Sequence, residues 1–300
     1  MKVILTGASS FSGMWLAKEL TAAGHDVIAL IRRRPEEYQG VRKKRVEYVS
    51  KLCRTEYGYS FGSEKFRKFL SAVPCDLFCH HAAEVEDYKS PDFNVAKALT
   101  ANTCEIQKTL CSLNCRGIIL TGSVFEPEND QPAVSAYGLS KGLTWSVFSY
   151  YAEQIKIPLA KFVIPNPFGP FEEMRFTSFL ICEWKRGNIA EILTPDYVRD
   201  NIPVSLLAKS YVDFAERFLK KNSFMTFRPS FYAESQGEFT KRFAGNMEKR
   251  LGFACPFVLK KQISFPEPKV RVNTDRLDAK KLEWKEELAW DELAAYYEGL

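Results

Sequence analysis

Residues 1–13 read MKVILTGASSFSG, so a short apolar run leads directly into a turn with glycines at positions 7 and 13. Apolar residues then recur at helical spacing up to Gly24, and residues 27–31 (VIALI) form a second apolar run. This pattern predicts a strand, a tight turn, a helix and a second strand. The first backbone N–H groups of such a helix can bind a pyrophosphate. The predicted cofactor-binding turn consists of Gly7, Ser10, Phe11, Ser12 and Gly13.

Ser10 stands where the usual dinucleotide fingerprint has its middle glycine. Its side chain narrows the space for a close phosphate, although the small hydroxyl could also donate a hydrogen bond to it. The strand before the turn and the helix after it favour a dinucleotide site over a purely structural turn.

The residue at the end of the second strand indicates which dinucleotide binds. An acidic residue there accepts from a ribose diol, whereas a cation meets a 2′-phosphate. Here the strand runs into Arg32, Arg33 and Arg34. A guanidinium can bind a phosphate through two hydrogen bonds, so we expect NADP, contacted by Arg32. NAD is the alternative, because the three arginines would also suit a solvated basic loop.

Strands and helices are expected to alternate through the first half of the chain. Further strands are predicted over residues 45–49, 76–83, 117–123 and 159–164, and helices over residues 64–72, 93–114 and 136–155. This alternation predicts an α/β protein with a doubly wound parallel sheet of the Rossmann type. The fourth strand ends in His81, Ala82 and Ala83, whose small alanines leave room for a ligand.

The pattern changes after residue 165, where the proline-rich sequence PNPFGP forms a rigid loop. We expect residues 1–165 to form the NAD(P)-binding domain. Residues 192–220 should return to it, since residues 197–204 resemble a strand that precedes a helix. A smaller C-terminal substrate-binding lobe is then expected from residues 166–191 and 221–300.

Composition narrows the class of protein. The net charge of +5 is modest and spread along the chain, which does not favour nucleic acid as a partner. No apolar run approaches the ~20 residues of a membrane span, and the first residues do not form a signal peptide. The eight cysteines include no CxxC pair. We therefore expect a cytoplasmic protein with reduced cysteines, no metal site and no membrane partner.

Tyr137 and Lys141 lie four residues apart on a predicted helix, so their side chains share one face. An ammonium close to a phenol favours the phenolate, which makes tyrosine a usable acid–base group. Ser123 ends the preceding strand and can hydrogen-bond the same substrate oxygen. This order of serine, tyrosine and lysine behind a dinucleotide turn predicts a catalytic site.

Over nearly its whole length the chain resembles the extended short-chain dehydrogenase/reductases, which include nucleotide-sugar epimerases, dehydratases and 4-ketoreductases. The resemblance implies that Ser123, Tyr137 and Lys141 are catalytic, and that Tyr137 and Lys141 also contact the cofactor. It adds His81, Ala82, Ala83 and Asn102 to the cofactor-binding residues. One departure concerns Lys51, which falls where an aspartate commonly contacts adenine.

The resemblance also implies a nucleotide-diphosphate sugar as substrate. Asn166 matches the asparagine that contacts the diphosphate, Arg199 belongs to a segment like the family's RDxxxV, and Arg271 matches its diphosphate-binding arginine. From the residues alone, Arg199 could instead pair with Asp200 or another acid, and Arg271 with Glu267. Relatives dimerise through the helices that carry Asn102 and Tyr137, so a homodimer is expected.

Three reactions share such a catalytic centre. Dehydration needs a carboxylic acid close behind the serine, and Glu126 lies one place too far along for that role. Epimerases hold a tightly bound cofactor, usually NAD, whereas reductases exchange NADPH. Arg32 favours a 4-keto nucleotide-sugar reductase, with a 4-epimerase as the alternative. A non-catalytic NADP-binding regulator is the alternative of another class, but such proteins commonly lack the tyrosine or the lysine.

Overall fold

The computed structural model describes residues 1–128 and 131–299 and divides the chain into two compact units. Unit 1 consists of Met1–Ile164 and Ala208–Arg228, and unit 2 of Pro165–Leu207 and Pro229–Leu300. The returning segment of unit 1 is therefore residues 208–228 rather than 192–220. The reason is strand β9 (Val198–Pro203), which pairs with strands of unit 2.

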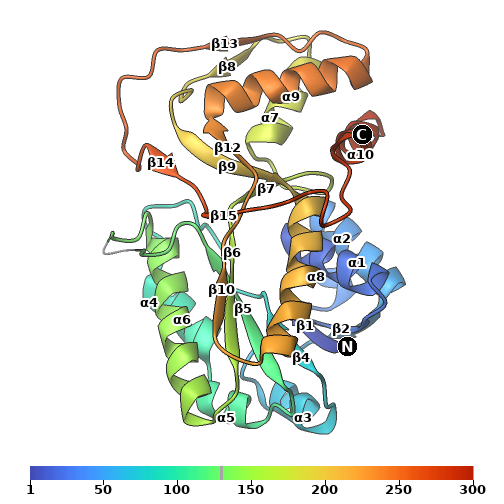
Figure 1. Ribbon diagram of the computed structural model, residues 1–300, viewed down its shortest axis with the longest axis vertical. Helices are drawn as coiled ribbons and strands as arrows, with labels where there is room; N and C mark the ends of the chain where they lie inside the picture. Colours follow the sequence, from blue (N-terminus) through green and yellow to red (C-terminus); the bar gives the residue numbers. More distant parts are fainter. Residues whose placement is uncertain (129–130, 300) are drawn as a thin grey trace. The chain divides into compact units, whose positions relative to one another are not determined.

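Unit 1 is built on a seven-stranded sheet in the order β10-β6-β5-β4-β1-β2-β3 (Figure 1). Every strand pair in it is parallel. The predicted doubly wound Rossmann fold is thus confirmed. Its strands are β1 (Lys2–Thr6), β2 (Asp26–Ile31), β3 (Arg54–Tyr57), β4 (Leu77–His80), β5 (Gly117–Ser123), β6 (Leu159–Ile164) and β10 (Met225–Phe227).

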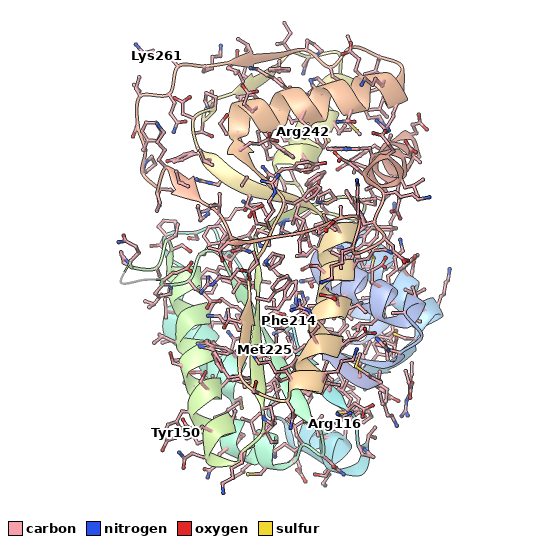
Figure 2. All side chains as sticks on the ribbon, viewed as in Figure 1. Arg116, Tyr150, Phe214, Met225, Arg242 and Lys261 are labelled. Atoms are coloured by element: carbon pink, nitrogen blue, oxygen red, sulfur yellow. The ribbon has the colours of Figure 1, made fainter. Side chains whose placement is uncertain are left out.

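Helices lie on both faces of this sheet (Figure 1). One face carries α1 (Phe11–Ala22), α2 (Gly40–Leu52) and α8 (Val204–Lys221), and the other α3 (Glu64–Ala72), α4 (Val95–Thr103), α5 (Ile106–Cys111) and α6 (Ala136–Gln154). Phe214, labelled in Figure 2, projects from α8 onto β6 and β10, with ring centroids 5.7 Å from Phe162 and 5.5 Å from Phe227. A short 3₁₀ turn, Pro35–Glu37, follows β2. None of the described helices is long and apolar enough to cross a bilayer.

The strand predicted over residues 45–49 is wrong, because these residues belong to α2. Val46 and Val49 are both buried, and their spacing of three residues is helical rather than alternating. The long side chains around them also favour a helix. The true third strand, β3, follows at Arg54–Tyr57 and has no buried residue, so it carried no apolar signal.

The long helix predicted over residues 93–114 is interrupted. Helix α4 ends at Thr103 and α5 begins at Ile106, with Glu105 in the left-handed region at φ 49°. The carbonyl of Cys104 lies against Gly62, where a Cβ atom would come within 2.1 Å of its oxygen. The interruption between α4 and α5 therefore coincides with packing against Gly62, which the apolar pattern of residues 93–114 does not reveal.

Unit 2 contains small sheets and three helices, α7 (Phe176–Lys185), α9 (Gln236–Leu251) and α10 (Glu286–Glu298). Strand β9 is antiparallel to β12 (Tyr232–Ser235) and parallel to β7 (Asn166–Phe168) and β14 (Val270–Arg271). Two further parallel pairs are β8 (Ala190–Ile192) with β13 (Phe257–Leu259), and β11 (Pro229–Ser230) with β15 (Asp275–Arg276).

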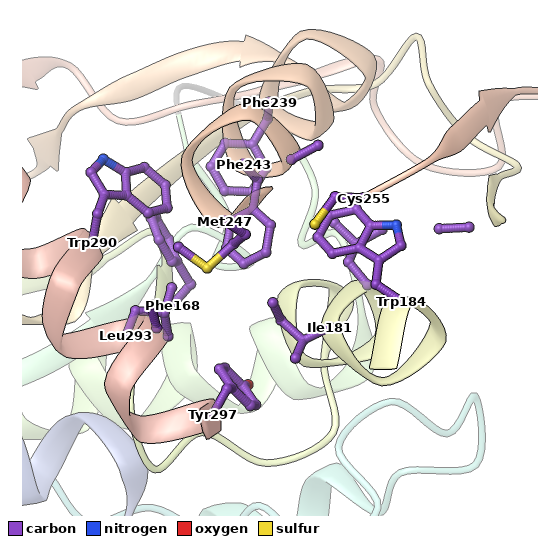
Figure 3. Close-up of a cluster of buried hydrophobic side chains, with 14 of the residues drawn as sticks. Phe168, Ile181, Trp184, Phe239, Phe243, Met247, Cys255, Trp290, Leu293 and Tyr297 are labelled. Atoms are coloured by element: carbon purple, nitrogen blue, oxygen red, sulfur yellow. The ribbon is translucent and has the colours of Figure 1, made fainter. Parts of the chain in front are cut away.

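The core of unit 2 is rich in aromatic side chains (Figure 3). Phe168 from β7 packs against Phe239, Phe243 and Trp290, with ring centroids 5.3 to 6.0 Å away. Trp290 and Tyr297 of α10 are buried there.

One buried carboxyl of unit 2, that of Glu172, has hydroxyl groups as its hydrogen-bond donors. Thr177 donates to its Oε1 atom at 2.6 Å and Tyr297 at 3.1 Å. Burial raises the pKa of Glu172 to about 7.

Candidate active site

The turn between β1 and α1 has the close backbone packing that a dinucleotide site needs. Gly7 has φ +79°, and a Cβ atom there would lie 2.7 Å from the backbone nitrogen of Ala82. A Cβ atom at Gly13 would lie 2.1 Å from the Gly7 carbonyl oxygen. Both positions therefore require glycine. The turn also sits beside the point where the strand order reverses, between β1 and β4, which is where such sheets bind dinucleotides.

Ser10 is the N-cap of α1. Its hydroxyl donates to the Gly7 carbonyl at 2.8 Å and accepts from the Gly13 N–H at 3.1 Å. Because this proton is used inside the turn, the hydroxyl does not serve as a phosphate donor in the way its position suggested. The first turn of α1 has no acidic residue, so its N-terminal dipole is available to a diphosphate. The turn thus fits a dinucleotide cofactor.

His81 connects this turn to the end of β5. Its Nε2 atom lies 3.0 Å from Ser12 Oγ and 3.1 Å from Ser10 Oγ, and its Nδ1 atom lies 3.0 Å from Thr121 Oγ1. Burial and the Lys141 ammonium lower the pKa of His81 to about 3. The imidazole is therefore neutral and links two parts of the predicted cofactor site.

His80 has a different environment. Its ring stacks on Phe148 and Phe78, with centroids 5.2 and 5.7 Å away, and its Nδ1 atom lies 2.9 Å from Thr6 Oγ1. One histidine packs in the core while its neighbour takes part in the polar network, as expected for adjacent residues of a strand end.

Arg32 follows β2 as predicted, but its guanidinium is paired. Its Nη1 atom lies 3.2 Å from Glu84 Oε2, shortly after Ala82 and Ala83. The backbone N–H of Glu84 in turn donates to Asn102 Oδ1 at 2.8 Å. Asn102 is buried on α4 and therefore supports the loop after β4.

Lys51 is not at a strand end. It lies exposed in the last turn of α2, because the third strand begins only at Arg54. Lys51 therefore does not occupy the position of the family's adenine-contacting aspartate, because that correspondence assumed a third strand at residues 45–49.

Tyr137 is the second residue of α6. Its ring makes edge contacts with Tyr88, Phe93 and Phe125, with centroids 5.3, 5.9 and 6.3 Å away. Gly138 permits this packing, since a Cβ atom there would lie 1.9 Å from the Phe125 carbonyl oxygen. The turn after β5 therefore packs against the start of α6.

Lys141 is buried on the same helix and donates to the Thr121 carbonyl at 2.5 Å. Burial lowers the pKa of Lys141, and the Glu126 carboxylate partly opposes this effect. Thr121 therefore meets Lys141 through its carbonyl and His81 through its hydroxyl. Its position two residues before Ser123 puts both hydroxyls on one face of β5. The sequence interpretation assigned no role to Thr121.

Glu126 is bound to its own turn and to β6. Its Oε1 atom accepts from the Ser123 N–H at 2.7 Å, and its Oε2 atom lies 2.5 Å from Lys161 Nζ. The carboxylate is thus committed to an ion pair, which agrees with the argument against 4,6-dehydration. Lys161 was missed, although a lysine within the apolar strand sequence LAKFVI was a visible signal.

In unit 2, Arg199 and Arg271 share one carboxylate. Arg199 Nη2 lies 3.1 Å and Arg271 Nη1 lies 2.9 Å from the same oxygen, Oε2 of Glu267. Arg199 also donates to the carbonyls of Pro268 and Lys269. Burial and the neighbouring Arg199 lower the pKa of Arg271 to about 10. The two guanidinium ions therefore bind one anionic group, and this group is the carboxylate of Glu267.

Asp200 does not pair with Arg199. Its carboxylate accepts from the backbone N–H groups of Phe231 at 2.9 Å and Asn273 at 3.1 Å. Burial raises the pKa of Asp200, and these two hydrogen bonds oppose the rise. Asp200 therefore joins segments of unit 2.

Asn166 lies opposite Asn201 in the register of β7 and β9. The side-chain Nδ2 atoms of both are buried and have no hydrogen-bond partner among the described residues. Two adjacent amide donors without acceptors point to a polar ligand at this part of unit 2. Asn166 was predicted, whereas Asn201 was not singled out.

Residues 3–212 match the model of the NAD dependent epimerase/dehydratase family. The chain therefore belongs to this family and is an enzyme of the extended short-chain dehydrogenase/reductase type. No curated protein sequence matches it significantly.

Solved structures with a similar fold include UDP-glucuronic acid 4-epimerase from Bacillus cereus with NAD and a fluorinated UDP-sugar. It has a TM-score of 0.73 and 17% identity, over 100% of this chain and 99% of that one. UDP-glucose 4-epimerase from Stenotrophomonas maltophila, with bound NAD, has a TM-score of 0.76 and 13% identity, over 100% and 98%. The Thermotoga maritima UDP-glucose 4-epimerase, with UDP-glucose, has a TM-score of 0.71 and 17% identity, over 100% and 99%.

Proposed function

We propose that the enzyme inverts C4 of a nucleotide-diphosphate sugar with NAD, and that Tyr137 is its acid–base group. The observation that carries this proposal is the start of α6, where Lys141 is held at the end of β5 and Tyr137 is enclosed by aromatic rings. The resemblance to the extended short-chain dehydrogenase/reductases implies that this pair serves the oxidation and reduction of a sugar carbon.

Epimerisation is preferred here to the reductase reaction that Arg32 favoured. The Arg32 guanidinium already has a carboxylate partner in Glu84, which weakens the argument for a 2′-phosphate. The structures of similar fold reported above are 4-epimerases, and two of them contain NAD. The Arg32–Glu84 pair and the similarity to 4-epimerases therefore both favour NAD and epimerisation.

Each residue of the centre has a separate task in this proposal. Tyr137 removes the proton from the C4 hydroxyl and later returns it to the ketone. Lys141 favours the phenolate and holds the nicotinamide ribose, while Ser123 or Thr121 hydrogen-bonds the reacting oxygen. A bound NAD would supply the hydride acceptor, and inversion would require the hydride taken from C4 to return to the opposite face of the 4-ketone.

Unit 2 is proposed to bind the nucleotide diphosphate. Arg199 and Arg271 supply two guanidinium groups, and Asn166 and Asn201 supply amide donors. Such a set suits a diphosphate, whose oxygens accept several hydrogen bonds.

The proposal is tested with purified enzyme and UDP-hexoses, without added reductant. We expect interconversion at C4, measured by NMR, and NAD as the nucleotide released on denaturation. Tyr137→Phe should reduce turnover by about 10²- to 10⁴-fold, because it removes the group that exchanges the proton. NAD should still be released from this variant on denaturation, because the turn between β1 and α1 and Lys141 are unchanged.

A 4-ketoreductase remains the second candidate, because Arg32 is half-exposed at the end of β2 and could exchange Glu84 for a phosphate. A reductase would consume NADPH in proportion to product, whereas an epimerase consumes none. Release of no cofactor together with NADPH oxidation by a 4-keto sugar would therefore overturn the epimerase.

A homodimer is also part of the proposal. Leu139, Leu143 and Tyr150 are exposed on α6, and Tyr150 points away from the sheet in Figure 2. Their spacing places them on one side of the helix, as a helix–helix interface requires.

A further inference from the structure

Lys161 is an unusual residue in its surroundings. It lies within β6, between β5 and β10, and its side chain is only 10% exposed. Its Nζ atom lies 2.5 Å from Glu126 Oε2 and 4.9 Å from the centroid of the Trp145 ring. A buried lysine is costly unless it is paired, so this ion pair needs a reason.

Gly122 provides the space that the Lys161–Glu126 pair occupies. A Cβ atom on Gly122 would lie 2.8 Å from Lys161 Cε and 3.0 Å from Glu126 Oε1. Gly122 is the neighbour of both Thr121 and Ser123 on β5. The pair is therefore built into the strand end that carries the candidate hydroxyls.

Glu126 holds the turn that follows Ser123. Its Oε1 atom accepts from the Ser123 N–H at 2.7 Å, and its own N–H donates to the Ser123 carbonyl at 3.1 Å. The N–H of Phe125 donates to Ser123 Oγ at 3.3 Å, and the Phe125 ring contacts Tyr137. Glu126 thus orients both a hydroxyl and a wall of the tyrosine pocket.

The same carboxylate acts on Lys141. The groups that face Lys141 are His80 at the end of β4, His81 directly after it, Glu126 after β5 and Lys161 on β6. Burial lowers the pKa of both histidines to about 3, so they are neutral. The two charged neighbours oppose each other, since Glu126 raises the pKa of Lys141 and Lys161 lowers it.

We propose that Lys161 is a positioning residue that neutralises Glu126, so that Glu126 can hold the Ser123 turn without cancelling the effect of the Lys141 ammonium on Tyr137. This inference rests on the proposed role of Tyr137 as acid–base group. In this proposal, Lys161 and Glu126 contact neither the substrate nor the cofactor.

The test is a pH titration of phenolate absorbance, in which wild type minus Tyr137→Phe isolates one of the 13 tyrosines. Lys161→Met leaves the carboxylate unbalanced and should move the midpoint upward. With an effective dielectric constant of about 20, a unit charge about 10 Å from a phenol moves the titration midpoint by about one pH unit. Each variant is paired with its own Tyr137→Phe version.

Three companion variants separate charge from packing. Glu126→Gln, which keeps an acceptor for the Ser123 N–H, should move the midpoint downward. The double variant Glu126→Gln/Lys161→Met loses no net charge and should return close to the wild-type midpoint. Lys161→Arg keeps the positive charge, so its titration midpoint should also stay close to the wild-type value. If Lys161→Met does not fold, the Glu126→Gln and double variants still give the two predicted directions.

An unchanged midpoint in Lys161→Met, or a double variant that stays with Lys161→Met, would overturn the inference. Failure of the proposed function has a different signature. Tyr137 would then titrate no earlier than ordinary tyrosines in the wild type, while a Lys161-dependent shift would still be measurable.

Discussion

Each unit contains one carboxylate close to two cations, and the two arrangements differ in exposure. In unit 1 Glu126 is 5% exposed and pairs with Lys161, while Lys141 binds a carbonyl instead. In unit 2 Glu267 is 45% exposed, and two arginines contact the same one of its oxygens. The first carboxylate is enclosed by the fold, whereas the second lies partly in water.

This difference teaches that similar charge sets can serve opposite purposes. A buried pair keeps its geometry because an unpaired buried charge is expensive. A half-exposed carboxylate loses little when it moves into water. The Glu126 cluster therefore suits a fixed catalytic centre, and the Glu267 cluster suits a site that exchanges ligands.

The largest expected effect comes from removing each carboxylate in turn. Glu126→Ala should lower the free energy of unfolding by about 3–5 kcal/mol, because Lys161 stays buried without a partner. Glu267→Ala should cost roughly 1 kcal/mol or less, since its carboxylate is partly in water. Urea unfolding of both variants measures this contrast. Equal losses would show that exposure does not separate the two clusters.

Glu172 extends the comparison to a buried carboxyl that accepts hydrogen bonds from two hydroxyl groups. Its pKa of about 7 lies above the value near 4.5 of an ordinary glutamate, so the folded protein holds this proton more tightly than the unfolded chain. Stability should therefore fall as pH rises from about 4.5 through 7, by at most about 3–4 kcal/mol. Glu172→Gln should remove this decline.

The check for Glu172 is the urea midpoint measured between pH 5 and pH 8. Glu173→Gln, at the exposed neighbouring position, is the matched control and should keep the wild-type dependence. A parallel fall in wild type and Glu172→Gln would assign the effect to other groups.

The smallest expected effect concerns ligand exchange at Glu267. Glu267→Gln removes the carboxylate that competes for Arg199 and Arg271, so UDP should bind about five- to tenfold more tightly, or about 1 kcal/mol. Calorimetry with UDP gives the value. Glu234→Gln is the control, because Glu234 binds a separate arginine, Arg242, in the same unit. Weaker binding in Glu267→Gln would mean that Glu267 holds the arginines in place for the ligand.

Much of unit 1 could be predicted from the sequence. The glycine turn, α3, β5, α6 and β6 were expected almost where they lie, because apolar periodicity and small residues mark them. Strand β3 was missed because its residues are polar and partly exposed. The break after Thr103 was missed because Gly62, far away in the sequence, packs there.

The polar contacts of the candidate site were harder to predict. The sequence named His81 and Ser123, but their partners Thr121 and Glu126 depend on how β4, β5 and the following turn meet. The pairing of Arg271 with Glu267 was foreseen as an alternative, since the two are four residues apart. The ion pair of Arg32 with Glu84 joins positions 52 residues apart and had no local signal.

The division of the chain has a consequence for its synthesis. Neither unit is one continuous stretch, because the chain passes between them after residues 164, 207 and 228. One edge strand of the seven-stranded sheet, β10, comes last of its strands and emerges from the ribosome only after the first segment of unit 2. Until then β6 has a free edge, so a nascent chain stalled before Met225 should be the form most exposed to aggregation and in most need of a chaperone.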